Sequence, residues 1–416
     1  MAQLSDDCFV VGGGLMNIDA ARRSIFERLA PVEGVEAVPL RQSAGRTLAQ
    51  DISAPIAVPG FDNSAVDGYA VRFDDLDPAG ETVLRCVDRI AAGHDPAATL
   101  MPGLAVRIFT GAALPAGADV VIMQEDCRRD GDRVVIRPGI KRGANTRRAG
   151  EDVALGSVAL AAGRRLGPAD LGLLAALGFA HVPVCRRLRV ALLSTGDEVR
   201  EPGTMLAGRQ IFDANRYMLA GLLERLGVEV DDRGIVPDDP TALAAALRQA
   251  ADESDLIVTS GGVSTGEEDH IRSAIANHGS LYFWRLAIKP GRPVAMGQIG
   301  STPLAGLPGN PVAALLTFAL VARPMIEALG GTTPHLAQRF RVLADFDYRK
   351  KTGRREYVRA SLERAPGLAR ARRYAKEGAG MLTSLTETDG LVELGEDTTR
   401  IQPGAEVDFV PYSELI

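Results

Sequence analysis

The sequence predicts a multidomain protein of the α/β and β classes, with a doubly wound α/β domain, a β-rich second domain, a small linking domain and a C-terminal β domain. At 416 residues the chain is too long for one ordinary domain. Residues 188–329 alternate short apolar runs with helical patterns, which is typical of a parallel sheet covered by helices. Residues 35–163 instead show short strand patterns separated by Gly and Pro turns, which indicates a β-rich module.

Composition argues against several classes of protein. The formal net charge is −6 and no block of Lys or Arg stands out, which argues against bulk nucleic-acid binding. We expect no membrane-spanning segment and no signal peptide, because no apolar run reaches the necessary length, and we therefore expect a cytoplasmic protein. The four cysteines lie far apart without a CxxC pair, so neither a zinc site nor a disulfide framework is expected.

The N-terminal residues predict an arm followed by a helix. Gly12-Gly13-Gly14 begins like a dinucleotide-binding fingerprint, but Asn17 stands where its last glycine is needed. We interpret this stretch as a flexible arm. Asn17 or Asp19 then caps a helix that keeps apolar residues at helical spacing as far as Leu29.

Three segments of the β-rich module carry more polar residues than an ordinary turn requires. They span residues 61–70, 110–112 and 145–152, and the last sets two arginines against two acids. Taken singly, each is best explained as a solvated loop, because polar turns are common on protein surfaces.

The α/β part is predicted element by element. A helix between Pro168 and Gly178 leads into it. The long helix at its end follows the turn Pro308-Gly309-Asn310-Pro311, in which Asn310 is a good cap and Pro311 a good first helical residue. Beyond residue 331, many short strands predict a separate β domain. Within the α/β part, strands are expected at residues 188–193, 228–230 and 256–258, and helices at residues 215–226, 241–251, 268–277 and 311–329.

The stretch around which the chain is organised spans residues 255–275. Its buried-strand pattern is followed by the small-residue turn Ser260–Gly266 and by a helix start rich in acids, an arrangement that presents backbone N–H groups to an anion. A plain helix start with a capping box explains the turn equally well. Asp269 favours the functional interpretation, because a carboxylate beside phosphates requires a cation between them, most simply Mg²⁺.

Parallel sheets bind ligands outside the C-terminal ends of their strands. This rule gathers acidic residues, both glycine turns and Lys289 at one edge of the predicted sheet. These groups are more than a solvated surface needs, so we expect a functional site there, although spacing alone does not name the reaction. The acids are Asp197, Glu198, Asp238 and Asp269.

Seven motifs occur in an order that resembles one family. They are FDNSAVDGYA at Phe61, TGA at Thr110, GEDV at Gly150, STGDE at Ser194, SGGVSTGEED at Ser260, LAIKPGRP at Leu286 and GLPGNP at Gly306. Together they resemble the molybdopterin molybdenumtransferases of the MoeA type, and they are also similar to the C-terminal domain of gephyrin. The resemblance implies insertion of molybdate into adenylylated molybdopterin, in a Mg²⁺-dependent step that releases AMP.

The resemblance also implies roles for individual residues. Three positions depart from the family pattern: Arg285 and Arg292 stand where lysines are common, and Ala379 stands where a serine is expected, which puts the oxyanion affinity in question. Catalytic residues are expected at Asp67, Thr110, Asp152, Glu198, Asp238 and Asp269, with Glu198 and Asp269 as Mg²⁺ ligands. Substrate-binding residues are expected at Ser194, Gly196, Gly261, Gly262, Ser264, Gly266, Arg285, Lys289, Arg292, Pro308, Gly309, Asn310 and Arg354.

The family has four domains and forms homodimers, so a composite active site shared by two subunits is expected here. Molybdopterin adenylyltransferase and apo-molybdoenzymes are further expected partners. Two alternative functions remain open, namely the adenylyltransferase that acts one step earlier and a non-catalytic cofactor-binding scaffold; tungstate is an alternative to molybdate. The implied bounds are residues 1–54 with 155–184 for linking domain I, 55–154 for the β-rich domain II, 185–330 for the α/β domain III of molybdopterin-binding type, and 331–416 for the C-terminal domain IV.

Overall fold

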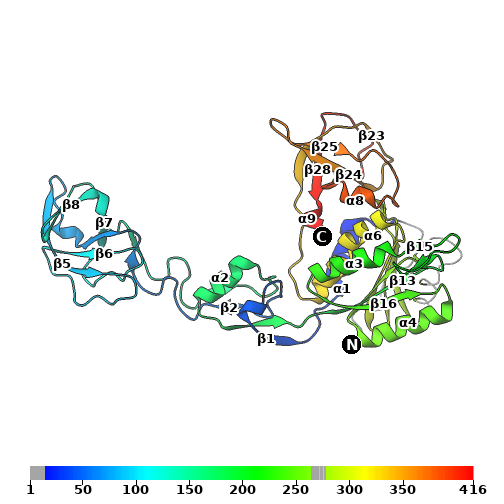
Figure 1. Cartoon of the computed structure of the whole chain (residues 1–416), viewed down its shortest axis with the longest axis horizontal. Coiled ribbons are helices and arrows are strands. Elements are labelled where there is room, and N and C mark those ends of the chain that lie inside the picture. Colours follow the sequence, from blue (N-terminus) through cyan, green and yellow to red (C-terminus); the bar gives the residue numbers. More distant parts are fainter. Residues whose placement is uncertain (1–14, 264–270, 272–274, 276–277, 416) are drawn as a thin grey trace.

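The computed structural model describes residues 15–263, 271, 275 and 278–415 (Figure 1). The chain is elongated. The β-rich module lies at one end, the α/β and C-terminal domains lie at the other, and a narrow linking segment joins them (Figure 1). The predicted glycine arm and most of the helix predicted at residues 268–277 lie outside the described residues.

The α/β domain is built on a six-stranded sheet in the order β16-β13-β17-β21-β20-β18. The strands from β16 to β21 run parallel, as the sequence predicts. β20 pairs antiparallel with both β21 and β18, so the sheet is mixed; the connection between β20 and β21 at Gly300 is too short for a parallel crossover. The strands are β13 (Arg189–Thr195), β16 (Glu229–Val236), β17 (Leu256–Ser260), β18 (Gly279–Arg285), β20 (Pro293–Ile299) and β21 (Thr302–Leu307).

Helices on both faces bury this sheet. Two of them start one residue earlier than the sequence predicts, because Asp213 and Asp239 are the capping residues and accept hydrogen bonds from the first turns. These two helices are α3 (Ala214–Arg225) and α4 (Pro240–Glu253). The long apolar helix comprises α6 (Pro311–Thr317), the π-helical turn η4 (Phe318–Ala322) and α7 (Arg323–Leu329).

The helix at residues 311–329 corrects one expectation. Among the described residues it is long and apolar enough, by length and composition, to cross a membrane. Yet 89% of its most apolar stretch is buried inside the protein, where it forms part of the main hydrophobic core. Its apolar character is therefore that of a core helix.

The N-terminal helix α1 (Ile18–Arg28) begins where the sequence predicts. The Asn17 side chain caps it by accepting a hydrogen bond from the backbone N–H of Asp19 at 2.8 Å. The sequence grouped this helix with the linking domain, whereas the structure packs Ile18, Ala21 and Ile25 into the core of the α/β domain.

The linking segment contains two short antiparallel pairs and one helix. Its junction with the α/β domain is fixed by Arg186, whose guanidinium donates to both carboxylate oxygens of Asp255 at 2.8 and 2.6 Å. The pairs are β1 (Val35–Pro39) with β12 (His181–Cys185) and β2 (Ile52–Ser53) with β11 (Val158–Leu160), and the helix is α2 (Pro168–Ala176). The short turn η1 (Leu40–Gln42) follows β1.

The β-rich module holds a six-stranded sheet in the order β7-β4-β6-β5-β9-β8 with a core of its own. The strands are β4 (Gly68–Val71), β5 (Thr82–Ile90), β6 (Leu104–Ile108), β7 (Val120–Met123), β8 (Cys127–Asp130) and β9 (Arg133–Ile136). A short pair, β3 (Asn63–Ser64) with β10 (Thr146–Arg147), and the turns η2 (Phe73–Asp75) and η3 (Gln124–Asp126) complete it.

The C-terminal domain is a small closed barrel, because β26 pairs with both β24 and β28. One strand from the α/β part, β19 (Ile288–Lys289), adds to the barrel beside β24. The barrel strands are β22 (Phe340–Ala344), β24 (Arg355–Glu363), β25 (Arg370–Arg373), β26 (Gly390–Leu394) and β28 (Glu406–Pro411). The remaining elements are β23 (Tyr348–Arg349), β27 (Arg400–Ile401), α8 (Thr383–Thr386) and α9 (Tyr412–Leu415).

Candidate functional site

A cavity of about 520 Å³ lies at the C-terminal ends of β13, β17 and β21, the edge that the sequence predicts to bind ligand. We call it the strand-end cavity. The structure brings many of the predicted site residues together around it. They are Ser194, Gly196, Glu198, Asp238, Gly261, Gly262, Pro308, Gly309 and Asn310.

Two glycines are required by the backbone of this edge. Gly196 has φ +142°, and a Cβ there would lie 2.7 Å from Oε2 of Glu198, so the glycine lets that carboxylate fold over the end of β13. Gly261 has φ +90°, and a Cβ there would lie 2.6 Å from the carbonyl oxygen of Thr195. The N–H of Gly261 donates to the carbonyl oxygen of Leu307 at 3.0 Å, which ties the turn after β17 to the end of β21.

Asn215 is a site residue that the sequence analysis missed. Its side chain is buried on α3 and donates from Nδ2 to Ser260 Oγ at 2.9 Å and to the carbonyl oxygen of Gly309 at 2.8 Å. It therefore bridges both glycine turns. A polar residue in the first turn of a helix that faces the strand ends was the sequence signal that could have found it.

Three buried side-chain oxygens of the strand-end cavity form no hydrogen bond among the described residues. They are Ser194 Oγ, Thr195 Oγ1 and Asn215 Oδ1. Buried polar atoms are normally paired, so these oxygens are available to pair with water or with a ligand in the cavity. The amide of Asn215 is oriented by its two donated bonds, which leaves its oxygen as an acceptor for a ligand donor.

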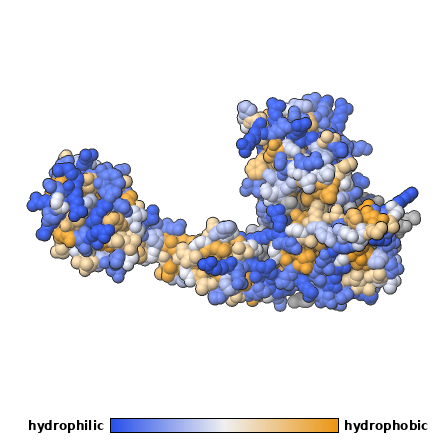
Figure 2. Space-filling view, viewed as in Figure 1, coloured by the Kyte–Doolittle hydropathy of each residue, from blue (hydrophilic) through white to orange (hydrophobic). Residues whose placement is uncertain are grey.

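An apolar flap forms another wall of the strand-end cavity. β14 (Val199–Arg200) and β15 (Ile211–Phe212) pair beside it, and Ile211 and Phe212 are 55% and 44% exposed. Figure 2 shows apolar surface gathered at the place of β15. Exposed apolar side chains beside polar turns suit a ligand that joins an aromatic ring to phosphates.

Of the four predicted acids, the structure describes Asp197, Glu198 and Asp238. Glu198 and Asp238 line the strand-end cavity, and Asp197 instead accepts a hydrogen bond from the backbone N–H of Asp238 at 3.2 Å. In the described part of the chain, no three His, Cys, Asp or Glu side chains cluster as a metal site. Asp269, Ser264 and Gly266 lie outside the described residues.

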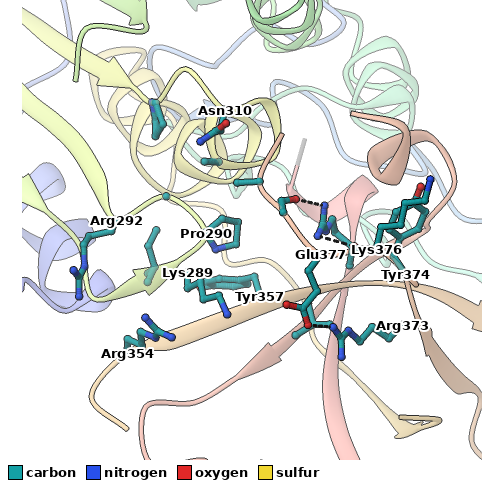
Figure 3. A pocket seen from close by; sticks show the side chains of 18 of the residues that line it. Lys289, Pro290, Arg292, Asn310, Arg354, Tyr357, Arg373, Tyr374, Lys376 and Glu377 are labelled. Carbon is teal, nitrogen blue, oxygen red and sulfur yellow. Dashed lines mark hydrogen bonds and ion pairs between the residues drawn. The ribbon is translucent and has the colours of Figure 1, made fainter. Parts of the chain in front are cut away.

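A second cavity of about 420 Å³ adjoins the first, with Pro293, Pro308 and Asn310 lining both. It lies between the α/β domain and the C-terminal barrel, and cationic side chains surround it (Figure 3). We call it the cationic cavity. Its cations are Lys289, Arg292, Arg354, Arg359, Arg373 and Lys376. Among the described lining residues, Glu377 is the one carboxylate.

Glu356 organises the cationic cavity from beneath, and the sequence analysis missed it. Its side chain is 1% exposed and lies 2.7 Å from Arg354 Nε and 3.3 Å from Lys289 Nζ. The Tyr348 hydroxyl also donates to it at 2.7 Å. Burial alone would raise the pKa of Glu356, but the hydrogen bonds from Tyr348 and Arg354 and the charge of Lys289 outweigh it and hold the pKa below its usual value.

Lys289 does not lie at the strand ends as the sequence predicts. It lines the cationic cavity, because β19 pairs with β24 of the barrel and not with the α/β sheet. Burial opposes its charge, yet Tyr348 and Glu356 together raise its pKa. Arg292 and Arg354 also line the cationic cavity, and exposed Arg285 lines neither one.

Asn310 occupies the capping position of α6, but its side chain makes no capping hydrogen bond. The N–H of Val312 in the first turn donates to the carbonyl oxygen of Ala379 at 3.0 Å. The turn of the C-terminal domain that carries Ala379 therefore occupies part of this helix start, and Asn310 is left to face both cavities.

The remaining predicted residues lie in the β-rich module. Oδ1 of Asp67 accepts hydrogen bonds from the backbone N–H of Thr110 at 2.9 Å and from its hydroxyl at 2.7 Å. The backbone bond is the larger cause of the lowered pKa of Asp67. Asp152 lies in the same module, where its N–H donates to the carbonyl oxygen of Val58. The linking segment separates this module from both cavities of the same chain (Figure 1).

Comparisons with known proteins agree on one family. The MoeA N-terminal region (domain I and II) matches residues 16–178, the probable molybdopterin binding domain matches residues 191–328, and the MoeA C-terminal region (domain IV) matches residues 341–412. A molybdopterin molybdenumtransferase of Haemophilus influenzae is 37% identical over 409 residues, which cover 97% of this chain and 100% of that one. Molybdopterin molybdenumtransferase 2 of Mycobacterium tuberculosis is 38% identical, over 89% and 93% of the two chains.

A solved structure agrees with these relatives. The molybdopterin biosynthesis moeA protein of Pyrococcus horikoshii superposes with a TM-score of 0.81 at 30% identity, over 96% of this chain and 100% of that one. The multidomain fold class predicted from the sequence is thereby confirmed. This chain belongs to the MoeA family of molybdopterin molybdenumtransferases.

Proposed function

We propose that this chain inserts molybdate into adenylylated molybdopterin in a Mg²⁺-dependent step that releases AMP, and that the two adjoining cavities hold the two substrates. Family membership makes the chain a molybdopterin molybdenumtransferase of molybdenum cofactor biosynthesis. The observation that carries the finer proposal is the contact between the cavities: a cation-lined space and a space edged by glycine turns share Pro293, Pro308 and Asn310.

The strand-end cavity suits the adenylylated pterin. Gly196, Gly262 and Gly309 have no side chain that would keep phosphate oxygens from the backbone, whereas the N–H of Gly261 is already bonded to Leu307. The exposed rings and alkyl groups of Phe212 and Ile211 offer an apolar surface to a planar ring system. The unpaired oxygens of Ser194, Thr195 and Asn215 can then pair with polar edges of the ligand.

The cationic cavity suits molybdate, an oxyanion with two negative charges. Lys289 and Arg354 are held by buried Glu356 before any ligand arrives, so little reorganisation is needed when the oxyanion binds. Because the cavities adjoin, an oxyanion in one lies beside a pterin in the other. Catalysis in this arrangement is mainly positioning and electrostatic stabilisation.

Mg²⁺ fits the donor set of the strand-end cavity. Mg²⁺ commonly uses one or two carboxylates together with substrate phosphates and water, and Glu198 and Asp238 line this cavity. These two carboxylates would hold the ion, which would supply positive charge to the phosphates; Asp269, a ligand implied by the resemblance, lies outside the described residues. A complete carboxylate cage in the apo protein is not needed for such a site.

A homodimer with composite sites is part of the proposal. Asp67, Thr110 and Asp152 lie in the module that the linking segment separates from Glu198 in the same chain (Figure 1). A second copy would bring its β-rich module to this cleft. We further propose a cytoplasmic enzyme that receives its substrate from a molybdopterin adenylyltransferase and passes its product to apo-molybdoenzymes.

The test supplies purified protein with adenylylated molybdopterin, Mg²⁺ and molybdate. We expect AMP release that requires both Mg²⁺ and molybdate, and activation of an apo-molybdoenzyme by the product. Release of pyrophosphate from ATP with unmodified molybdopterin would support the adenylyltransferase alternative instead. Binding of the pterin without turnover in either assay would support a scaffold.

A further inference from the structure

Glu377 occupies the cationic cavity as an anion supplied by the chain itself. Its carboxylate forms an ion pair with Arg373, and Figure 3 shows the side chain extended toward that guanidinium within the cavity. The Glu377 side chain is 73% exposed. An exposed carboxylate can leave its partner for water with little loss of solvation.

Three other cations of this cavity have partners other than Glu377. Lys289 and Arg354 are held by Glu356 beneath the cavity. Arg359 donates to the carbonyl oxygen of Gly378 and to the hydroxyl of Ser384, neither of which carries a charge. Arg373 is therefore the cavity cation whose charge Glu377 neutralises.

Arg373 has a second contact that does not depend on Glu377. Its guanidinium lies over the ring of Tyr348, 5.0 Å from the centroid, and the ring is anchored by the hydrogen bond from its hydroxyl to Glu356. The backbone on the far side of Glu377 is fixed as well, because Gly378 accepts a hydrogen bond from Arg359 at 2.8 Å. The Glu377 side chain alone has to move for an oxyanion to reach Arg373.

We propose that Glu377 is an intramolecular competitor that sets the oxyanion affinity of the cationic cavity. This proposal rests on the proposed function, in which molybdate binds there. Glu377 pairs with Arg373 when the cavity is empty. Molybdate displaces it because an anion with two negative charges attracts the Arg373 guanidinium more strongly than one carboxylate does. The carboxylate thereby weakens oxyanion binding and raises the molybdate concentration at which the cavity fills.

The size of the effect follows from the exposure of the pair. Exposed ion pairs are worth up to roughly 1 kcal/mol, so removing the competitor should tighten molybdate binding by about two- to fivefold. The gain should shrink at high ionic strength, because salt already screens the pair.

The test measures molybdate binding by calorimetry with the full-length protein and its Glu377→Gln variant. We expect the variant to bind molybdate about two- to fivefold more tightly. Its KM for molybdate should fall, while its KM for adenylylated molybdopterin stays unchanged, a split that a structural role would not produce. Glu377→Asp keeps the charge and should bind like the wild type.

Two further comparisons sharpen the test. Glu363→Gln is the matched control, because Glu363 pairs with the neighbouring Arg372 at 3.2 Å but does not line the cavity, and it should not change molybdate binding. In an Arg373→Gln background, Glu377→Gln should have no effect.

Failure of this inference can be told apart from failure of the proposed function. Equal molybdate affinity of wild type and Glu377→Gln would overturn the inference alone. Absence of molybdate binding to wild type, with or without the pterin, would overturn the oxyanion assignment of the cavity and this inference together.

Discussion

Asn215 Nδ2 lies 2.8 Å from the carbonyl oxygen of Gly309 and thereby joins helix α3 to the turn that separates the two cavities. The same amide holds Ser260 at the end of β17. One buried side chain thus sets the relative position of both glycine turns.

Asn215→Asp should disturb this bridge without changing the size of the side chain. A carboxylate cannot donate to the Gly309 carbonyl oxygen, so two acceptors would face each other in a buried place. We expect a loss of roughly 1–3 kcal/mol in the free energy of unfolding. The KM for adenylylated molybdopterin should rise more than the KM for molybdate. Wild-type stability and kinetics of this variant would contradict the bridging role.

Glu356→Gln tests the buried carboxylate beneath the cationic cavity. At neutral pH the variant leaves Lys289 and Arg354 without a countercharge. The free energy of unfolding should therefore fall by roughly 2–4 kcal/mol, which thermal unfolding detects as a lower midpoint temperature. Molybdate binding should weaken because the two cations lose their fixed positions. This direction is opposite to that expected for Glu377→Gln, so the two glutamates are distinguishable in one assay.

The same residue predicts a pH dependence. The pKa of Glu356 is lowered in the folded state, so its contribution to stability is present above its ordinary value of 4.5 and is lost as the pH falls through the lower folded value. The difference in stability between wild type and Glu356→Gln should therefore be full at pH 7 and shrink in acid. A difference that stays constant down to pH 3 would show that charge is not the cause.

The position of the strand-end cavity could be predicted from the sequence, because its strands and glycine turns are short contiguous patterns in the chain. Short apolar runs followed by glycine turns predict strands and their ends, and the rule for parallel sheets then assembles those ends. Glu198 and Gly261 were found in this way. Asn215 was the first residue of the predicted helix, a position where a polar residue is usually exposed to solvent.

The cationic cavity depended on contacts that no local pattern contains. Lys289 belongs to a strand that pairs with the barrel, a pairing between segments far apart in the chain. Glu356 stands in the charged run Arg354-Arg355-Glu356, which on its own predicts a solvated surface. Its burial follows from closure of the barrel around it, and closure is a tertiary property.

Glu198→Gln and Lys289→Ala should act on different substrates. Glu198 lies exposed at the strand-end cavity, so its substitution should change stability by less than roughly 0.5 kcal/mol while activity is lost, with a higher Mg²⁺ requirement. Lys289→Ala removes a cation of the other cavity and should raise the KM for molybdate. Calorimetry with each ligand separates the two effects. A large unfolding shift in Glu198→Gln would point to a structural role instead.

The last prediction concerns the number of chains that build one site. Asp67 and Thr110 are bonded to each other in the β-rich module, and the linking segment separates that module from Glu198 of the same chain (Figure 1). If these residues serve one reaction, a second subunit must supply one set. A dimer with two-fold symmetry would then carry two equivalent clefts, each built from both chains.

Complementation distinguishes a composite site from a site within one chain. Inactive Asp67→Asn and inactive Glu198→Gln proteins are mixed in equal amounts under conditions that exchange subunits. In a composite arrangement, each mixed dimer has one cleft with both substitutions and one with neither. Mixed dimers make up about half of the population, so activity should return to about a quarter of wild type. If each site lay within one chain, every cleft would carry a substitution and no activity would return. If labelling shows that subunits exchange and no activity returns, the shared site is excluded. The Glu198 and Lys289 variants would still test the chemistry of each cavity separately.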